Sequence, residues 1–185
     1  MKNHCYLLLA ICTLFISSCK KDNHEEPSAT GAGTLTATNY GFDSNGSAGK
    51  FSSTKLGITQ NTTAGITVFA LSAIKDGSNE SISIIVNRKI ATTGKITFVY
   101  NDSSNGGITY SKDYTKPAHG TLNYKTDASN STTKGGGELN ITKFDGDKIE
   151  GTFNFVAINA NGKEAWAENH QSIKRHRLEK HLCQS

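Results

Sequence analysis

Apolar and polar residues alternate over short stretches from about Gly33 to Glu168, and this pattern predicts β-strands. No stretch shows a convincing helical period, and Gly, Asn and Asp separate the runs, as expected for turns. The predicted strands are Thr34–Tyr40, Phe51–Ile58, Gly65–Ile74, Ser81–Val86, Lys95–Tyr100, Ile108–Tyr114, Thr121–Lys125, Glu138–Phe144, Lys148–Ile158 and Lys163–Glu168. We therefore expect an all-β fold, a single antiparallel β-sandwich or barrel-like domain of about nine or ten short strands. Strand order is not visible in the sequence, so sandwich and barrel both remain open.

Three segments give more specific expectations. Gly65–Ile74 carries apolar residues on both faces, which predicts a strand covered on both sides. Asp145-Gly146-Asp147 and Asn161-Gly162 each separate two strand-like runs and predict tight hairpins, because Asp-Gly and Asn-Gly adopt positive φ easily. Residues 127–137 are polar and end in three glycines, which predicts a mobile loop.

The N-terminus has the features of a secretion signal. A short positive head is followed by an apolar run over Tyr6–Ile16, too short to cross a bilayer as a helix. Ile16-Ser17-Ser18-Cys19 resembles the bacterial lipobox, in which the cysteine receives the lipid and the signal is cleaved before it. We expect residues 1–18 to be a lipoprotein signal peptide, Cys19 to be lipidated, and residues 19–32 to form a charged, flexible tether. The membrane is then a partner through the lipid anchor, and the location is the cell envelope.

Charge and cysteine usage restrict the function further. The net charge of +4 comes from Lys2, with one positive charge, and residues 173–185, with three, so residues 19–172 are neutral. A neutral domain lacks the basic face of a nucleic-acid binder, and we expect no nucleic acid. Cys5 and Cys12 leave with the signal and Cys19 is lipidated, so Cys183 has no intramolecular disulfide partner.

One resemblance is carried by residues late in the chain. Ile141–Asp145, Lys148–Phe155 and the Asn-Gly-Lys turn at 161–163, together with Gly33–Ala37, resemble a family of small Bacteroidota outer-envelope lipoproteins of unknown function. The charged residues after Cys19 are also similar to the stretch that directs some of these lipoproteins to the outer leaflet. The resemblance implies an all-β domain anchored in the outer membrane, with the leaflet open. It implies no catalytic residue.

The last residues depart from that family. The family closes with one more strand, which here begins at Ala165–Glu168, but residues 169–185 are basic and rich in histidine. We therefore expect the domain to span 33–168, with 169–185 a tail outside the fold, functional or out of frame. His170, His176, His181 and Cys183 are the one metal-like cluster, but their spacing matches no standard zinc or copper site, so we expect no metal and no cofactor.

Catalytic signatures are absent from the sequence. It contains no Gly-x-Ser-x-Gly elbow, no His-Glu-x-x-His and no phosphate-binding glycine loop before a helix, so we expect no enzyme. His119 is a single loop histidine, and Asp43–Gly46 and Asp102–Gly106 are interpreted as turns, not calcium loops. The tyrosines either line a concave binding face or form cross-strand pairs; they are Tyr100, Tyr110, Tyr114 and Tyr124.

These observations favour a non-catalytic binding or interaction module at the envelope, with a small-molecule, glycan or protein ligand. The alternative is a lipocalin-like carrier of a small apolar ligand inside a barrel. The two alternatives differ in the interior of the domain. In a packed binding module side chains fill it, whereas a carrier leaves a cavity there for its ligand.

Overall fold

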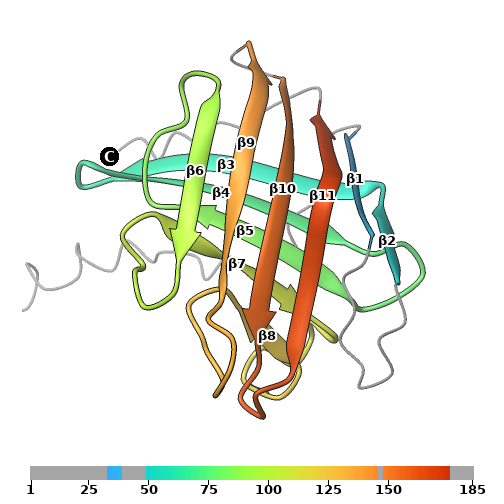
Figure 1. Ribbon diagram of the computed structural model, residues 1–185. Coiled ribbons are helices and arrows are strands. Elements are labelled where there is room, and N and C mark those ends of the chain that lie inside the picture. The colour runs from blue at the N-terminus through green and yellow to red at the C-terminus, as the bar shows by residue number, and fades with distance from the viewer. Residues whose placement is uncertain (1–32, 39–48, 146–147, 176–185) are drawn as a thin grey trace, which may run out of the picture.

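The computed structural model describes residues 33–38, 49–145 and 148–175, with the side chains of 168–172, 174 and 175 left undescribed. The described residues form eleven strands and confirm the all-β prediction (Figure 1). The strands are β1 (Gly33–Thr38), β2 (Lys50–Ser53), β3 (Lys55–Thr63), β4 (Ile66–Ile74), β5 (Ser81–Val86), β6 (Gly94–Val99), β7 (Gly106–Ser111), β8 (Asn123–Lys125), β9 (Gly136–Phe144), β10 (Ile149–Ile158) and β11 (Glu164–Arg175). Among these residues, no helix is long and apolar enough to span a membrane.

All strand pairs are antiparallel, and they form two layers. The front sheet has the order β6-β9-β10-β11-β1-β2, and the back sheet has the order β8-β7-β5-β4-β3. Figure 1 shows the strands of one layer crossing those of the other. A single residue pair, Ile158 of β10 with Lys125 of β8, joins the sheets along one side. The arrangement is an open sandwich: within the described residues, the end strands β2 and β3 share no paired residues that would close a barrel.

The opposite side is joined by the chain itself. Thr54 separates β2 from β3, and Ser53 and Leu56 are both fully buried although they are three positions apart. The inward alternation therefore shifts by one residue here, which turns the chain from one sheet into the other. Asp76 stabilises this corner, because its carboxylate accepts hydrogen bonds from the Thr54 backbone N–H at 3.1 Å and the Thr54 hydroxyl at 3.0 Å. The predicted single strand Phe51–Ile58 is thus two strands in different sheets.

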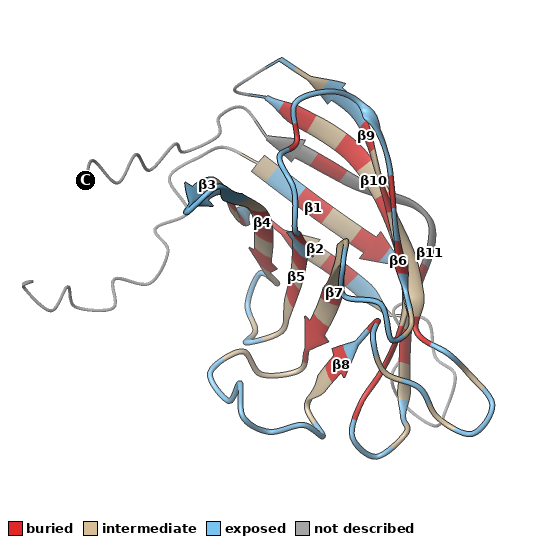
Figure 2. Ribbon diagram, turned by 90° about the vertical axis from the view of Figure 1, so that its left-hand side faces the viewer, coloured by how far each residue is buried: buried red, intermediate tan, exposed pale blue. Residues whose placement is uncertain are grey.

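Buried residues recur along the strands of both sheets (Figure 2), and their side chains form one hydrophobic core cluster. The largest of them are fully buried aromatic residues: Phe51, Phe69, Phe98, Tyr110, Tyr124, Phe153 and Phe155. The loop between β5 and β6 adds Ile90 to this core. The Ile90 backbone N–H donates to Gln60 Oε1 at 2.7 Å, which fixes the loop against β3. Dense aromatic packing of this kind is the main favourable term in the folding of such a domain.

Both predicted hairpins are confirmed by the pairing of β9 with β10 and of β10 with β11. The residues Asp145 and Lys148 flank the first turn, and the Lys148 backbone N–H donates to Asp145 Oδ1 at 2.8 Å. In the second turn, Gly162 has a φ of 72°, which a side chain would disfavour.

Two sequence-based expectations about coverage and boundaries are wrong. Gly65–Ile74 is not covered on both sides: Phe69, Leu71 and Ala73 are buried, but Ile66 on the other face is 66% exposed. The fold also does not end at 168, because β11 continues to Arg175 and residues 172–175 pair with β1. The polar residues in 169–175 interrupt the alternation of apolar and polar residues, so the sequence pattern does not show that the strand continues. The backbone of this segment pairs with β10 on one side and with β1 on the other. Residues 176–185 lie outside the described residues.

Ile173 tests the corrected boundary. It is 1% exposed and stands between Gly151 of β10 and Leu35 of β1 in the core. We expect Ile173→Ala to lower the free energy of unfolding by about 2–4 kcal/mol through loss of burial and a residual cavity. Ile85→Ala is the matched control, because Ile85 is 44% exposed; we expect a cost below about 1 kcal/mol. Urea denaturation measures both, and equal effects would mean that residues beyond 168 do not belong to the fold.

Candidate functional site

A row of four residues crosses the outer face of the front sheet. Val99 of β6 stands opposite Gly136 of β9, Gly136 opposite Val156 of β10, and Val156 opposite Trp166 of β11. Direct cross-strand partners share a face, and the neighbours of Trp166, Ala165 and Ala167, are buried, so this row faces outward. The row is apolar, and Val99 is 51% exposed. Three apolar side chains thus flank one position that has none.

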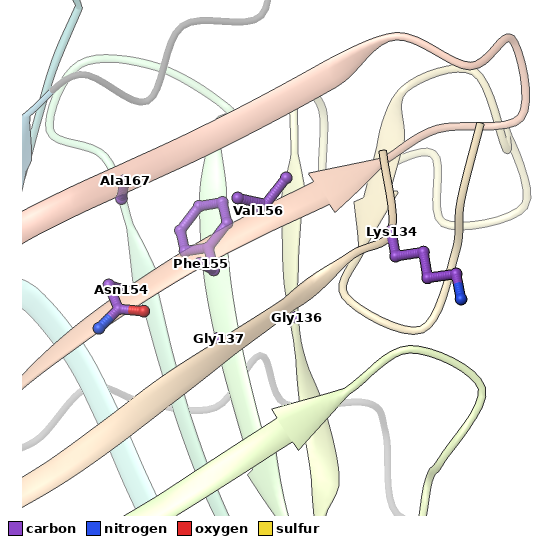
Figure 3. Close-up of a pocket in the computed structure, with 7 residues that line it drawn as sticks. All are labelled: Lys134, Gly136, Gly137, Asn154, Phe155, Val156 and Ala167. Atoms are coloured by element: carbon purple, nitrogen blue, oxygen red, sulfur yellow. The ribbon is translucent and has the colours of Figure 1, made fainter. Parts of the chain in front are cut away.

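The missing side chain creates a groove. A depression of about 490 Å³ lies over Gly136 and Gly137 and is bordered by Asn154, Val156 and Lys134 (Figure 3). We refer to it as the groove. Position 137 also requires glycine, but for a steric reason: a Cβ added at Gly137 would lie 2.5 Å from the Asn154 carbonyl oxygen. The predicted loop over 127–137 is therefore wrong at its end: Gly136 and Gly137 are part of β9.

A row of polar residues runs beside the apolar row, and one of them, Asn154, also lines the groove. Thr97 is paired with Glu138, and Glu138 with Asn154, so these three share the row next to the apolar one. The Glu138 carboxylate is 3.3 Å from Lys95 Nζ, in an exposed ion pair. Beside Asn154 the pairing of β10 with β11 is irregular. One residue of β10 lies between Phe153 and Phe155. Three residues of β11 lie between Gln171 and Ala167, the partners of these two phenylalanines. Such bulges are common next to functional sites because they interrupt regular pairing.

The loop before β9 supplies a cation at the other end of the groove. Lys134 Nζ lies 5.7 Å from the centre of the Tyr100 ring, in a cation–π contact. Asn130 orders this loop: its Oδ1 accepts backbone N–H groups from Thr132 and Thr133 at 2.9 and 2.7 Å. Its Nδ2 donates to the Gly162 carbonyl at 3.0 Å and to Glu164 Oε1 at 2.9 Å. The loop that carries Lys134 is thus fixed to the β10–β11 turn.

Glu164 is the acceptor at the centre of this network. Hydrogen bonds from the Thr133 side chain and then from Asn130 lower the pKa of the Glu164 carboxyl, more than partial burial raises it. The ionised form is therefore the one that holds the loop. Asp102 and Asp113 also have lowered pKa values, through bonds from Ser104 and Thr115 within their own exposed turns. None of these three carboxylates lines the groove.

The residues singled out in the sequence lie elsewhere or outside the described residues. Cys19, the lipidation candidate, and Asp43–Gly46 fall outside them, as do His176, His181 and Cys183. Among the described residues, no three His, Cys, Asp or Glu side chains are grouped to hold a metal. His119 is exposed, and its backbone carbonyl accepts from Asn123 Nδ2 at 2.8 Å in a turn. Asp102 Oδ1 accepts the Ser104 N–H at 2.9 Å, which confirms the predicted turn there.

The cross-strand alternative is confirmed for two of the four tyrosines, and the binding-face alternative stays a prediction. Tyr110 and Tyr124 are a buried cross-strand pair with ring centres 5.6 Å apart. The Tyr110 hydroxyl donates to Glu80 Oε2 at 2.7 Å, so its polar end is satisfied. Tyr100, by contrast, stands beside Lys134 near the groove.

Sequence reasoning missed the groove and the apolar row that crosses it. Val99, Gly136, Val156 and Trp166 come from four strands, and only the register places them in one row. One signal was available: Trp166 is the single tryptophan of the chain and alternates with two alanines. That pattern indicates small residues facing the core and a large aromatic one facing outward.

Comparisons with models of known families, with curated proteins and with solved structures give no match. The resemblance to small Bacteroidota lipoproteins therefore stays a prediction.

The Glu164 network predicts a specific pH dependence. A lowered folded pKa stabilises the fold above the unfolded value of about 4.3, and this contribution is lost as the pH falls through the folded value. We expect Glu164→Gln to lower the urea midpoint at about pH 7, and the difference from the wild type to shrink as the pH falls below about 4.3 and through the lowered pKa of the folded carboxyl. An equal loss across this pH range would contradict a role for the ionised carboxylate.

Proposed function

We propose that this chain is a lipid-anchored, non-catalytic binding module of the cell envelope, and that the groove holds a glycan. The observation that carries the proposal is the combination of an apolar row, Val99, Val156 and Trp166, with the adjacent polar groups Asn154 and Glu138. A sugar ring presents both kinds of surface. Its C–H faces pack on aromatic and aliphatic side chains, while its hydroxyls exchange hydrogen bonds with amide, carboxylate and ammonium groups.

The shape of the groove also supports a chain-like ligand. It is open, its lining includes the polar side chains of Lys134 and Asn154, and Glu138 follows Gly137 along β9 in the neighbouring row. An extended oligosaccharide lying along β9 would meet a cation, the apolar row and the Glu138 ion pair in turn. The carboxylates with lowered pKa values are engaged in turns and in loop anchoring, which favours binding over acid–base chemistry.

The carrier alternative places the ligand between the sheets instead. Seven large aromatic side chains are fully buried there, in space that a carrier would need for its ligand. The groove is therefore the better-supported site. A carrier would copurify with an apolar molecule detectable by native mass spectrometry, whereas the groove is open to exchange with solvent.

Membrane attachment rests on the sequence before Gly33. Ile16-Ser17-Ser18-Cys19 fits a lipobox, and the outer membrane of a Bacteroidota-like envelope is the proposed location. We expect the wild-type chain, expressed in a bacterium with lipoprotein processing, to lose residues 1–18, to gain the mass of the lipid and to partition into detergent. Cys19→Ala should lack the lipid mass. The same mass shift in both proteins, or none in the wild type, would contradict lipidation at Cys19.

Tryptophan fluorescence tests binding at the apolar row, because the single tryptophan of the chain, Trp166, is paired with Val156 of the groove lining. We expect titration with short glucan, mannan, xylan and chitin oligosaccharides to shift the emission of Trp166 for at least one of them. Asn154→Ala should weaken that binding about fivefold, the effect of losing one hydrogen bond worth ~1 kcal/mol.

The matched control is Thr109→Ala, a polar position on the outer face of the back sheet, paired with Ser83. This variant should bind as the wild type does. No spectral change with any oligosaccharide, or equal weakening by both substitutions, would contradict the glycan site.

A further inference from the structure

The strand register defines which end of the domain the anchor segment approaches. Gly33, the first residue of β1, is paired with Arg175 at the end of β11, and Arg175 is paired with Ile149 at the start of β10. Figure 1 shows these strand ends together with the β9–β10 hairpin and the β5–β6 loop at the top of the front sheet. We refer to this as the anchor end, because residues 19–32 lead into it from Cys19.

Cations gather at the anchor end. Arg88 and Lys89 in the β5–β6 loop and Lys148 in the β9–β10 hairpin are exposed, and none of the three forms an ion pair within the described part of the chain. Lys95 and Lys143 lie close by, with side chains 65% and 53% exposed. Two carboxylates offset these last two, since Glu138 is 3.3 Å from Lys95 and Glu150 is 3.6 Å from Lys143. Asp145 is the remaining described acid there, and its Oδ1 accepts from the Lys148 backbone N–H.

The β5–β6 loop also encloses a small pocket. A depression of about 170 Å³ is lined by the loop from Arg88 to Ile96 and by Ile141. Three cationic residues contribute to its lining, Arg88, Lys89 and Lys95, with Thr92 and Thr93 between them. The loop is held in place by burial of Ile90 and by its hydrogen bond to Gln60. Guanidinium, ammonium and hydroxyl donors in a fixed loop match the acceptor oxygens of a phosphate group.

We propose that the anchor end docks on the membrane through Arg88, Lys89 and Lys148, with the phosphate of an anionic lipid headgroup in the loop pocket. The proposal rests on the lipid anchor assigned above, which would hold this end near the bilayer. The fourteen residues 19–32 span at most about 50 Å when extended, so the tether allows the contact and the cations would favour it.

Docking would orient the groove. The ten residues of β10 extend about 30 Å from the anchor end, and Val156 lies about 23 Å along them. This distance exceeds the screening length of about 8 Å at physiological salt, so residues at the far end do not sense the headgroup charge. The groove would then stand clear of the membrane and remain open to ligands from the side.

Vesicle binding of the mature chain 19–185 with Cys19→Ser tests the docking without a lipid anchor. We expect binding to phosphatidylcholine vesicles containing about one third phosphatidylglycerol, loss of binding in high salt, and little binding to phosphatidylcholine alone. The triple variant Arg88→Gln, Lys89→Gln, Lys148→Gln should bind the anionic vesicles about a hundredfold more weakly, at about fivefold for each cation.

The matched control removes three cations from the far end: Lys116→Gln, Lys125→Gln, Lys163→Gln. It lowers the net charge equally and leaves the basic residues 176–185 in place, so the two variants differ in the position of the charges removed and in the Lys116–Asp113 ion pair that the control also loses. We expect its binding to stay within about threefold of the starting chain, since the far end lies outside the screened field. Equal losses in the two variants, or no binding of the starting chain to anionic vesicles, would overturn the proposal. The assay contains neither a lipidated cysteine nor an oligosaccharide, so its outcome is independent of lipidation and of glycan binding.

Discussion

The pairing of β10 is the constraint on which the rest of the structure depends. It pairs with β9 on one side and β11 on the other along most of its length, and with β8 through Ile158 at its end. A strand between two ladders has its backbone groups satisfied on both edges, so it cannot move without breaking both. Its inward residues, Phe153 and Phe155 among them, carry a large part of the apolar surface buried between the sheets.

Glycine makes this crowded position possible. At Gly151 an added Cβ would lie 2.5 Å from the Asn140 carbonyl oxygen, next to the register shift between β9 and β10. Gly137 admits the close approach of β10 in the same way on the facing strand. The absence of side chains that allows the strands to pack also leaves the floor of the groove open at Gly136. Packing and the candidate site are therefore consequences of the same sequence feature, the Gly135-Gly136-Gly137 run.

The two ends of β10 give the molecule a direction. Ile149 begins it at the anchor end, paired with Arg175, whereas Val156 lies near its other end, paired with Trp166. The cations of the anchor end and the apolar row are thus separated along one strand of about 30 Å. An anchored binding module needs this separation, because a ligand site near the bilayer would compete with lipid headgroups for space and for polar contacts.

The sequence predicts the strand content well because alternation is local. Ile82, Ile84 and Val86 specify an inward face without reference to any other strand, and the two hairpins follow from Asp-Gly and Asn-Gly. It fails where the answer depends on distant residues. The corner at Thr54 depends on Asp76, the end of β11 depends on partners in β1, and the exposure of Ile66 depends on which sheet faces lack a covering layer. Prediction of the groove and of the apolar row fails for the same reason, since the strands that form them must first be in register.

Native-state hydrogen exchange tests the central role of β10 most directly. If β10 holds the two sheets together, its amides should exchange only through global unfolding, and so more slowly than those of the edge strands β3 and β6. Their exchange free energies should equal the unfolding free energy measured in urea. Faster exchange in β10 than in β3 would show that the sheets separate without global unfolding, and would contradict the central role of β10.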